Sequence, residues 1–339
     1  MTQKAMGQVR PEVLFIEESF QLNKRFVGQV PLSFRKETEA LNAKKLDEYN
    51  LTGSIHTVAI KSPGTVDDIS KELPDGVIKP CRPRNSKNGI HTTSIVNANK
   101  LVGDLFTYDG FKTAFDTIIG CTDITDYEII RTDMRFDSYD IDHYEKFAKL
   151  NRYLLSLQAT LYNIKNRYIT RDLYSEKQLS VAVKNGHIEI EAYDKNRESN
   201  GRDPAMSRLE ERSVNMKGGD IQTEFLEIWF DRWDKALSDS NIAAVHRNYN
   251  EALVKQYNDG KNAFPVQFRS VNEFLVQHRN QIFCRKQMVD LLREIDPEHD
   301  PEQKADNFKR RFGIEYFQKS DLKRAVGEIK RATKAFFDN

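Results

Sequence analysis

Three short segments in the middle of the chain alternate apolar and charged residues strictly enough to place acids, bases and a tyrosine on one surface. The segments are residues 127–137, 186–195 and 207–213. Because side chains of a β-strand point alternately to opposite faces, paired strands would gather every second residue on one side. That side would carry Arg131, Asp133, Arg135, Asp137, His187, Glu189, Glu191, Tyr193, Lys195, Arg208, Glu210 and Arg212.

Two kinds of chemistry fit this charged face. Asp133, Glu191 and Glu210 could bind a hard divalent cation through carboxylate oxygens, and His187 could add an imidazole nitrogen. Alternatively, the interleaved arginines could neutralise the acids in a cross-strand ladder without any metal. Lys195 is a candidate phosphate clamp or proton donor, or a solvated charge at the end of a strand. The residues alone leave both interpretations open.

The surrounding pattern predicts the elements that must position this face. Strand-like runs occur at 54–60 and 90–96, and apolar residues at helical spacing predict helices over 108–119 and 143–158. Asn185 and Gly186 separate two strand-like runs and are typical of a type I′ hairpin turn. We therefore expect an α+β protein, with an antiparallel sheet, helices on its apolar side and the charged row on its open side.

Composition sets further limits. At 339 residues the chain is long enough for two domains, and its formal charge of +1 excludes a general polycation. The three cysteines, Cys81, Cys121 and Cys284, are too few and too scattered for a disulfide framework. No apolar run is long enough to cross a bilayer, so we expect a cytoplasmic protein without a membrane partner. Gly218 and Gly219 suggest a boundary, which gives an arm at 1–50, a sheet domain at 51–217 and a helical domain at 218–339.

The C-terminal region combines bases with aromatic residues. From Pro301 to Asn339 there are ten Lys or Arg residues against six Asp or Glu residues. Such a region suits contact with the DNA backbone, although a helix with its basic side in water has the same pattern. The candidate DNA contacts are Lys309, Arg310, Arg311, Lys323, Arg324, Lys330 and Arg331, together with Arg131, Arg135 and Arg208 of the charged face.

The order of three motifs resembles that of a known family. ArgThrAspMetArgPheAsp (131–137), AlaTyrAspLysAsnArgGlu (192–198) and SerArgLeuGluGluArg (207–212) resemble the rolling-circle replication initiators of Gram-positive plasmids, a family with trans-acting Rep proteins. They are also similar to relaxases of conjugative elements and to gene II type replication proteins of filamentous phages. The resemblance covers about residues 90–215.

This resemblance implies a divergent HUH endonuclease, with an RRM-like antiparallel sheet, that nicks one DNA strand through a tyrosine and a divalent metal, Mg²⁺ or Mn²⁺. Asp133, Glu191 and Glu210 would correspond to the acidic metal or active-site positions, and Lys195 to the basic residue after the strand. The implied partners are single- and double-stranded origin DNA and a host replication helicase, with a homodimer possible.

The chain departs from the family pattern at the nucleophile. The hairpin strand before Tyr193 reads GlnLeuSerValAlaValLys (178–184) and contains no tyrosine, so Tyr174 and then Tyr168 are the nearest upstream candidates. None of the seven histidines forms a His-apolar-His pair. The alternatives are a catalytically inactive DNA-binding initiator or regulator of a mobile element, and a partner-binding protein that uses the apolar stripe of Trp229 and Trp233.

Overall fold

The computed structural model describes residues 51–66, 73–138, 144–162, 180–184, 188–195, 207–216, 220–263 and 265–338. The expected N-terminal arm lies outside these residues, as do Tyr168, Tyr174 and His187. No helix of the described part is both long and apolar enough to cross a membrane.

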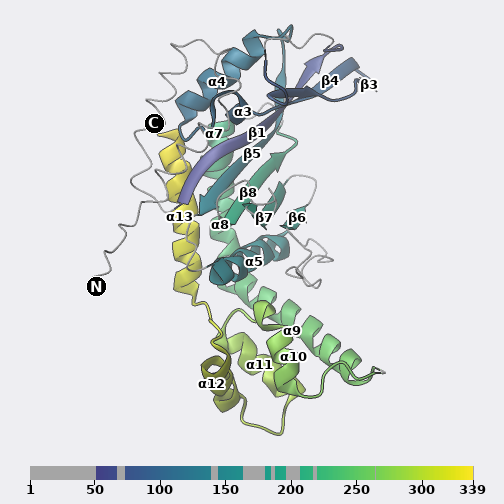
Figure 1. Cartoon of the computed structure of the whole chain (residues 1–339), viewed down its shortest axis with the longest axis vertical. Helices are drawn as coiled ribbons and strands as arrows, with labels where there is room; N and C mark the ends of the chain where they lie inside the picture. The colour runs from purple at the N-terminus through teal and green to yellow at the C-terminus, as the bar shows by residue number, and fades with distance from the viewer. Residues whose placement is uncertain are drawn as a thin grey trace, which may run out of the picture.

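An antiparallel sheet of eight strands forms the centre of the fold (Figure 1). The strands are β1 (Leu51–Pro63), β2 (Ile78–Pro80), β3 (Arg84–Ser86), β4 (Gly89–Val96), β5 (Glu128–Ser138), β6 (Ser180–Lys184), β7 (Ile188–Asp194) and β8 (Ser207–Val214). Their order is β2-β4-β1-β5-β8-β7-β6, and β3 pairs with β4. The last strand in sequence, β8, therefore lies between β5 and β7, so the three charged segments are direct neighbours.

Helices follow and interrupt these strands. The first group comprises α3 (Asn99–Val102), α4 (Tyr108–Gly120) and α5 (Tyr144–Leu161). The second comprises α7 (Ile221–Thr223), the π-helical turn η3 (Glu224–Ile228), α8 (Trp229–Ala236), α9 (Asp239–Lys261), α10 (Val271–Gln277), the 3₁₀ turn η4 (Arg279–Gln281), α11 (Arg285–Ile295), α12 (Pro301–Phe312) and α13 (Lys319–Phe337). Short polar side chains cap several N-termini, as when Ser238 Oγ accepts from the backbone NH of Asn241 and Asp300 caps α12.

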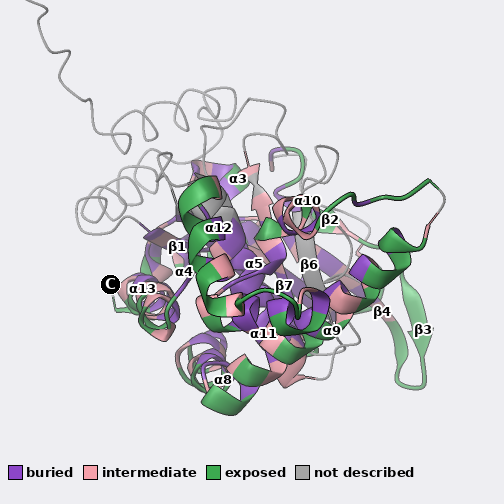
Figure 2. Ribbon diagram, turned by 90° about the horizontal axis from the view of Figure 1, so that it is seen from below, coloured by how far each residue is buried: buried purple, intermediate pink, exposed green. Residues whose placement is uncertain are grey.

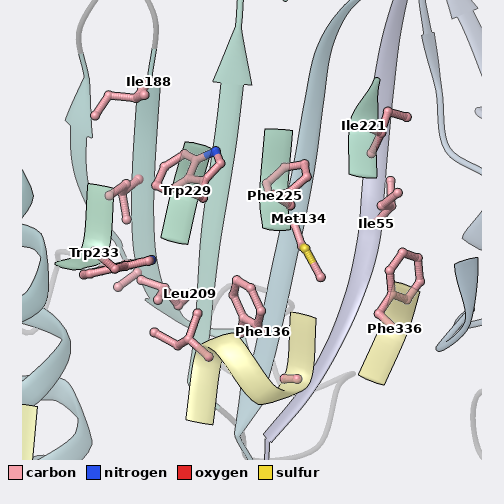
Figure 3. Close-up of a cluster of buried hydrophobic side chains, with 14 of the residues drawn as sticks. Ile55, Met134, Phe136, Ile188, Leu209, Ile221, Phe225, Trp229, Trp233 and Phe336 are labelled. Atoms are coloured by element: carbon pink, nitrogen blue, oxygen red, sulfur yellow. The ribbon is translucent and has the colours of Figure 1, made fainter. Parts of the chain in front are cut away.

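The apolar face of the sheet packs against helices from both ends of the second group (Figure 3). Every second residue of the strands points into this core, where indole and phenyl rings from η3, α8 and α13 cover them. The residues that make this contact include Ile55, Met134, Phe136, Ile188, Leu209, Ile221, Phe225, Trp229, Trp233 and Phe336. The expected α+β class, with helices on the apolar face of an antiparallel sheet, is confirmed.

A second, smaller core lies in the helical part of the chain. It is formed by the end of α9, by α10, α11 and α12, and by residues 314 and 316. The expected boundary near residue 217 does not separate the two cores, because α7, η3, α8, the first half of α9 and α13 all pack with the sheet. The last helix returns to the sheet and contacts β1, so the helical unit with its own core spans only about residues 253–316.

Candidate functional site

The register of β5, β8 and β7 brings the charged side chains of the three motifs together on the face opposite the core. Cross-strand partners share a face of the sheet. Six such partnerships build this surface, which we call the charged face: Asp133 with Arg212, Arg135 with Glu210, Asp137 with Arg208, Glu189 with Arg212, Glu191 with Glu210, and Tyr193 with Arg208.

Arg212 lies at the centre of this face, between carboxylates from three strands. Its Nη1 donates to Glu189 Oε1 at 2.7 Å. Its Nη2 lies 2.7 Å from Glu191 Oε2 and 2.5 Å from Glu210 Oε2, and its Nε lies 3.7 Å from Asp133 Oδ2. The guanidinium therefore occupies the point where the acids converge.

Glu210 connects Arg212 to a tyrosine and a histidine. The hydroxyl of Tyr193 donates to Glu210 Oε1 at 2.6 Å, and His56 Nδ1 lies 3.0 Å from the same oxygen. Burial raises the pKa of Glu210, but the contacts with His56, Arg212 and Tyr193 outweigh burial and hold this pKa well below its usual range. Glu210 is therefore ionised at neutral pH.

Tyr193 is a neutral phenol in this arrangement. Burial raises the pKa of Tyr193 well above its ordinary value, and the ionised Glu210 adds to the shift while Arg208 opposes it. A nucleophilic tyrosine needs the opposite shift or a base that accepts its proton. Tyr193 thus positions Glu210 and does not have the environment of an activated nucleophile.

Asp133 is also fully engaged. Arg131 donates to its two oxygens at 2.6 and 2.5 Å, and Thr57 Oγ1 donates to Oδ2 at 2.5 Å. Thr57 belongs to β1, where a bulge between Ile55 and Thr57 turns His56 toward the same face. Both β1 residues thereby join a network that the three motif strands begin.

Arg135 and Arg208, expected to contact DNA, are enclosed instead. Arg208 pairs with Asp137 at 2.5 Å, and Arg135 donates to Ser54 Oγ at 2.7 Å and pairs with Asp104. Only 4% and 2% of Arg135 and Arg208 are exposed, so neither guanidinium can reach a phosphate. Their role is to neutralise buried acids; Arg131, whose side chain is 35% exposed, is the more accessible base.

The described residues do not fit the expected metal site. Asp133, Glu191 and Glu210 do share one face, but each has an arginine partner, and the described part of the chain holds no group of three or more His, Cys, Asp or Glu side chains arranged for a metal ion. The cross-strand ladder is the arrangement found. The acids on this network are Asp104, Asp133, Asp137, Glu189, Glu191 and Glu210, which exceed the arginines 131, 135, 208 and 212 by two charges.

The remaining candidates lie at the margins of this face or far from it. Lys195 Nζ lies 6.0 Å from the centre of the Tyr193 ring, so the lysine of the Tyr-Asp-Lys motif belongs to the same cluster. The C-terminal bases divide between two helices. Lys309, Arg310 and Arg311 occupy the exposed last turn of α12, whereas Lys323, Arg324, Lys330 and Arg331 lie on α13.

The α13 bases are partly committed to neighbouring acids. Lys330 pairs with Asp234 at 2.6 Å, Arg324 with Asp321 at 3.3 Å, and Arg331 with Glu328. Lys309 and Arg311 lie over the rings of Tyr316 and Phe312 at 5.9 and 5.3 Å. These contacts leave the α12 bases exposed to solvent, which suits either interpretation of this region.

Sequence reasoning missed His56, Thr57 and Asp104. The two consecutive polar residues at 56 and 57 interrupt the apolar run 55–60, and this interruption was the available signal for a bulge. Asp104 carried no local signal, because only the folding of the α3–α4 connection beside β1 brings it to Arg135.

Comparisons with known proteins yield one weak likeness. The structure is similar to a rolling circle replication initiator protein from Geobacillus stearothermophilus, with 11% sequence identity, a TM-score of 0.23, and coverage of 49% of this chain and 76% of that chain. No model of a known protein family matches the chain. No curated protein matches its sequence. At this identity and TM-score, the likeness carries no evidence about activity.

Proposed function

We propose that this chain is a replication initiator of the rolling-circle type, which binds origin DNA and cleaves one strand through a tyrosine. The observation that supports the proposal is the convergence of the three motifs on one sheet face. Asp133, Tyr193 and Glu210 come from segments up to 77 positions apart, yet they belong to one connected set of hydrogen bonds and ion pairs. A cross-strand salt ladder alone would not require the Arg-x-Asp, Tyr-Asp-Lys and Arg-x-Glu order.

The proposed reaction is a transesterification. The tyrosine oxygen attacks the phosphorus, the bond to the 3′ oxygen breaks, and that oxygen leaves with a proton as a free 3′ hydroxyl. The 5′ phosphate stays covalently attached to the tyrosine. Tyr174 and then Tyr168 are the proposed nucleophiles, because Tyr193 is held as a neutral donor to Glu210.

The chain's own residues would then orient the reacting groups. Glu210, held ionised, fixes the Tyr193 hydroxyl and the Arg212 guanidinium in place, and the partly exposed Arg131 is the accessible guanidinium for a phosphate oxygen. Lys195 adds a second positive group beside Tyr193. The charged face still carries an excess of acid, so most of the affinity for DNA must come from other surfaces.

A second candidate function is a DNA-binding initiator that does not cut. The specific observation in its favour is the position of Arg212, which fills the place where the carboxylates could have met a divalent cation. Both candidates share the fold, the basic C-terminal helices and DNA as the partner. A helicase partner and a homodimer remain predictions for either.

The two candidate functions are distinguished by incubating the protein with a supercoiled plasmid that carries the origin recognised by this protein. Parallel reactions contain Mg²⁺, Mn²⁺ or EDTA. Conversion to open circles with protein attached to the 5′ end supports the initiator that cuts. A shift of origin fragments in a gel, with the plasmid remaining supercoiled in every reaction, supports the binder instead.

A further inference from the structure

A two-stranded hairpin extends from the edge of the sheet at β3 and β4 (Figure 1). β3 pairs with the start of β4, at Arg84 with His91, Asn85 with Ile90 and Ser86 with Gly89, while β4 pairs with β1 from His91 onward and with β2 at its end. Gly89 has a φ of 102°, a conformation that favours glycine, and closes the turn. We call residues 79–91 the β3–β4 wing.

The wing stands in solvent along most of its length. All residues from 81 to 90 are exposed, and Ile90 is 50% exposed. Figure 2 shows β3 in the colour of exposed residues, clear of the buried centre. The turn is nevertheless ordered, because Ser86 Oγ donates to Gly89 O at 3.0 Å and accepts from the backbone NH of Asn88 at 3.2 Å. An exposed but defined hairpin contributes little to a core and is available for binding.

The charge of the wing is entirely of one sign. It carries Lys79, Arg82, Arg84 and Lys87 and no Asp or Glu; acids are absent from the whole stretch 76–103. Since the whole chain has a net charge of +1, the other residues together carry a net charge of −3, so this concentration is local. Within the described residues, no ion pair neutralises Arg82, Arg84 or Lys87.

The shape of the wing suits a nucleic-acid duplex. The major groove of B-DNA, about 12 Å wide, admits a two-stranded β-ribbon. Arg84 and His91 are direct cross-strand partners and therefore lie on one side of the ribbon, with Lys87 at its tip. Basic groups at the tip and on the Arg84 side of the ribbon can contact phosphates along the groove, while the exposed Ile90 lies on the opposite side of the ribbon.

We propose that the β3–β4 wing is a binding site for double-stranded DNA, gripping the backbone through Arg82, Arg84 and Lys87. The proposal deepens the function proposed above, because it assigns the positive surface that the acid-rich charged face lacks. The wing would hold the duplex beside the origin while the sheet face receives the strand to be cut. A rival explanation is that Lys, Arg and Pro on this edge only prevent pairing with other sheets.

The test compares two triple variants that lose the same charge. The wing variant is Arg82→Gln, Arg84→Gln, Lys87→Gln; the control is Arg247→Gln, Lys255→Gln, Lys261→Gln, at exposed positions of α9. Binding to a short origin duplex is measured by fluorescence anisotropy over a range of salt concentrations. We expect the wing variant to bind about tenfold more weakly, with the slope of log K against log salt reduced by about 3, one unit per lost phosphate contact. The control variant should bind like the wild type.

Three outcomes would overturn the proposal. The wing variant could bind with wild-type affinity and slope, the control could lose as much as the wing variant, or the wing variant could aggregate while binding stays normal. Aggregation with normal binding would show that the basic residues of the wing only prevent the sheet edge from pairing with other molecules. Thermal unfolding of both variants should match the wild type, because the replaced side chains are exposed.

A single-stranded substrate separates this proposal from the nicking function. The wing variant should form the covalent adduct on a single-stranded origin oligonucleotide as well as the wild type does, because the wing grips only duplex DNA. If neither protein forms an adduct, the nicking proposal fails, while the anisotropy comparison still decides the role of the wing.

Discussion

Arg212 Nη2 lies 2.7 Å from Glu191 Oε2 on the neighbouring strand, at the point where the carboxylates of the sheet face converge. The same guanidinium contacts Glu189 and Glu210 and lies near Asp133. One cation with four carboxylate neighbours on adjacent strands is a strong determinant of how β5, β8 and β7 fit together. Its removal therefore tests the ladder directly.

Replacing Arg212 with alanine should destabilise the protein by ~3 kcal/mol, because removal of one partner leaves buried acids without their counter-charge. Glu210 and Asp133 are only 1% and 2% exposed, so water cannot replace the guanidinium effectively. Urea unfolding measures the change. Lys235→Ala removes the cation of an exposed helical pair with Asp231 and serves as the control, with no measurable loss of stability expected.

The Arg212→Ala variant should also gain a response to divalent cations. Without the guanidinium, Glu189, Glu191 and Glu210 lose their shared counter-charge on one face, and a group of carboxylates suits hard cations. Millimolar Mn²⁺ should raise the unfolding midpoint of the variant and leave that of the wild type unchanged. A wild-type midpoint that rises with Mn²⁺ and falls with EDTA would show that Arg212 does not hold the place of a cation.

The Tyr193→Phe variant should still form the covalent DNA adduct. The substitution removes the hydroxyl that donates to Glu210 and should cost ~2 kcal/mol of stability, as expected for a hydrogen bond to a charged group. Gel analysis of the adduct and urea unfolding measure the two effects. Loss of the adduct by a variant that still folds and binds DNA would instead identify Tyr193 as the nucleophile.

Glu211 makes the stability of the fold depend on pH. It lies on the apolar face, 1% exposed, and accepts from Trp233 Nε1 at 2.5 Å. Burial raises the pKa of Glu211 to about 8, against 4.5 in an ordinary environment. The folded state therefore keeps a proton that the unfolded state releases. The stability that this group contributes is fully present below pH 4.5 and is lost as the pH rises through about 8.

The substitution Glu211→Gln keeps an acceptor for Trp233 and removes this titration. The free energy of unfolding of the wild type should fall by several kcal/mol between about pH 5 and about pH 8.5, at ~1.4 kcal/mol for each unit of pKa shift. The variant should lack most of that fall, so the two proteins should differ most at high pH. Parallel slopes for both proteins would place the titrating group elsewhere.

The sequence predicted the composition of the charged face but not its connections. Strict alternation in β5, β7 and β8 was sufficient to assign faces, since the side-chain period of a strand is two. Alternation does not determine which strand lies beside which. The insertion of β8 between β5 and β7, which places Arg212 among the acids, depends on long-range pairing.

In the helical part of the chain, too, the sequence pattern did not predict the long-range contacts. The apolar stripe of Trp229 and Trp233 indicated a helix face that must be covered, but a pattern does not state which surface covers it. Those residues cover the sheet, so the two glycines at 218 and 219 do not mark the division between the cores. The burial of Arg135 and Arg208 was likewise hidden, because it depends on distant segments: Arg135 contacts Asp104 and Ser54, and Arg208 pairs with Asp137.

The most direct test of the nicking proposal is identification of the residue that becomes linked to DNA. The protein is incubated with a single-stranded origin oligonucleotide, the adduct is digested with trypsin, and the modified peptide is sequenced by mass spectrometry. We predict a 5′-phosphotyrosine at Tyr174, absent from Tyr174→Phe, while Tyr168→Phe retains it. Origin binding without any covalent adduct in the wild type would contradict the account.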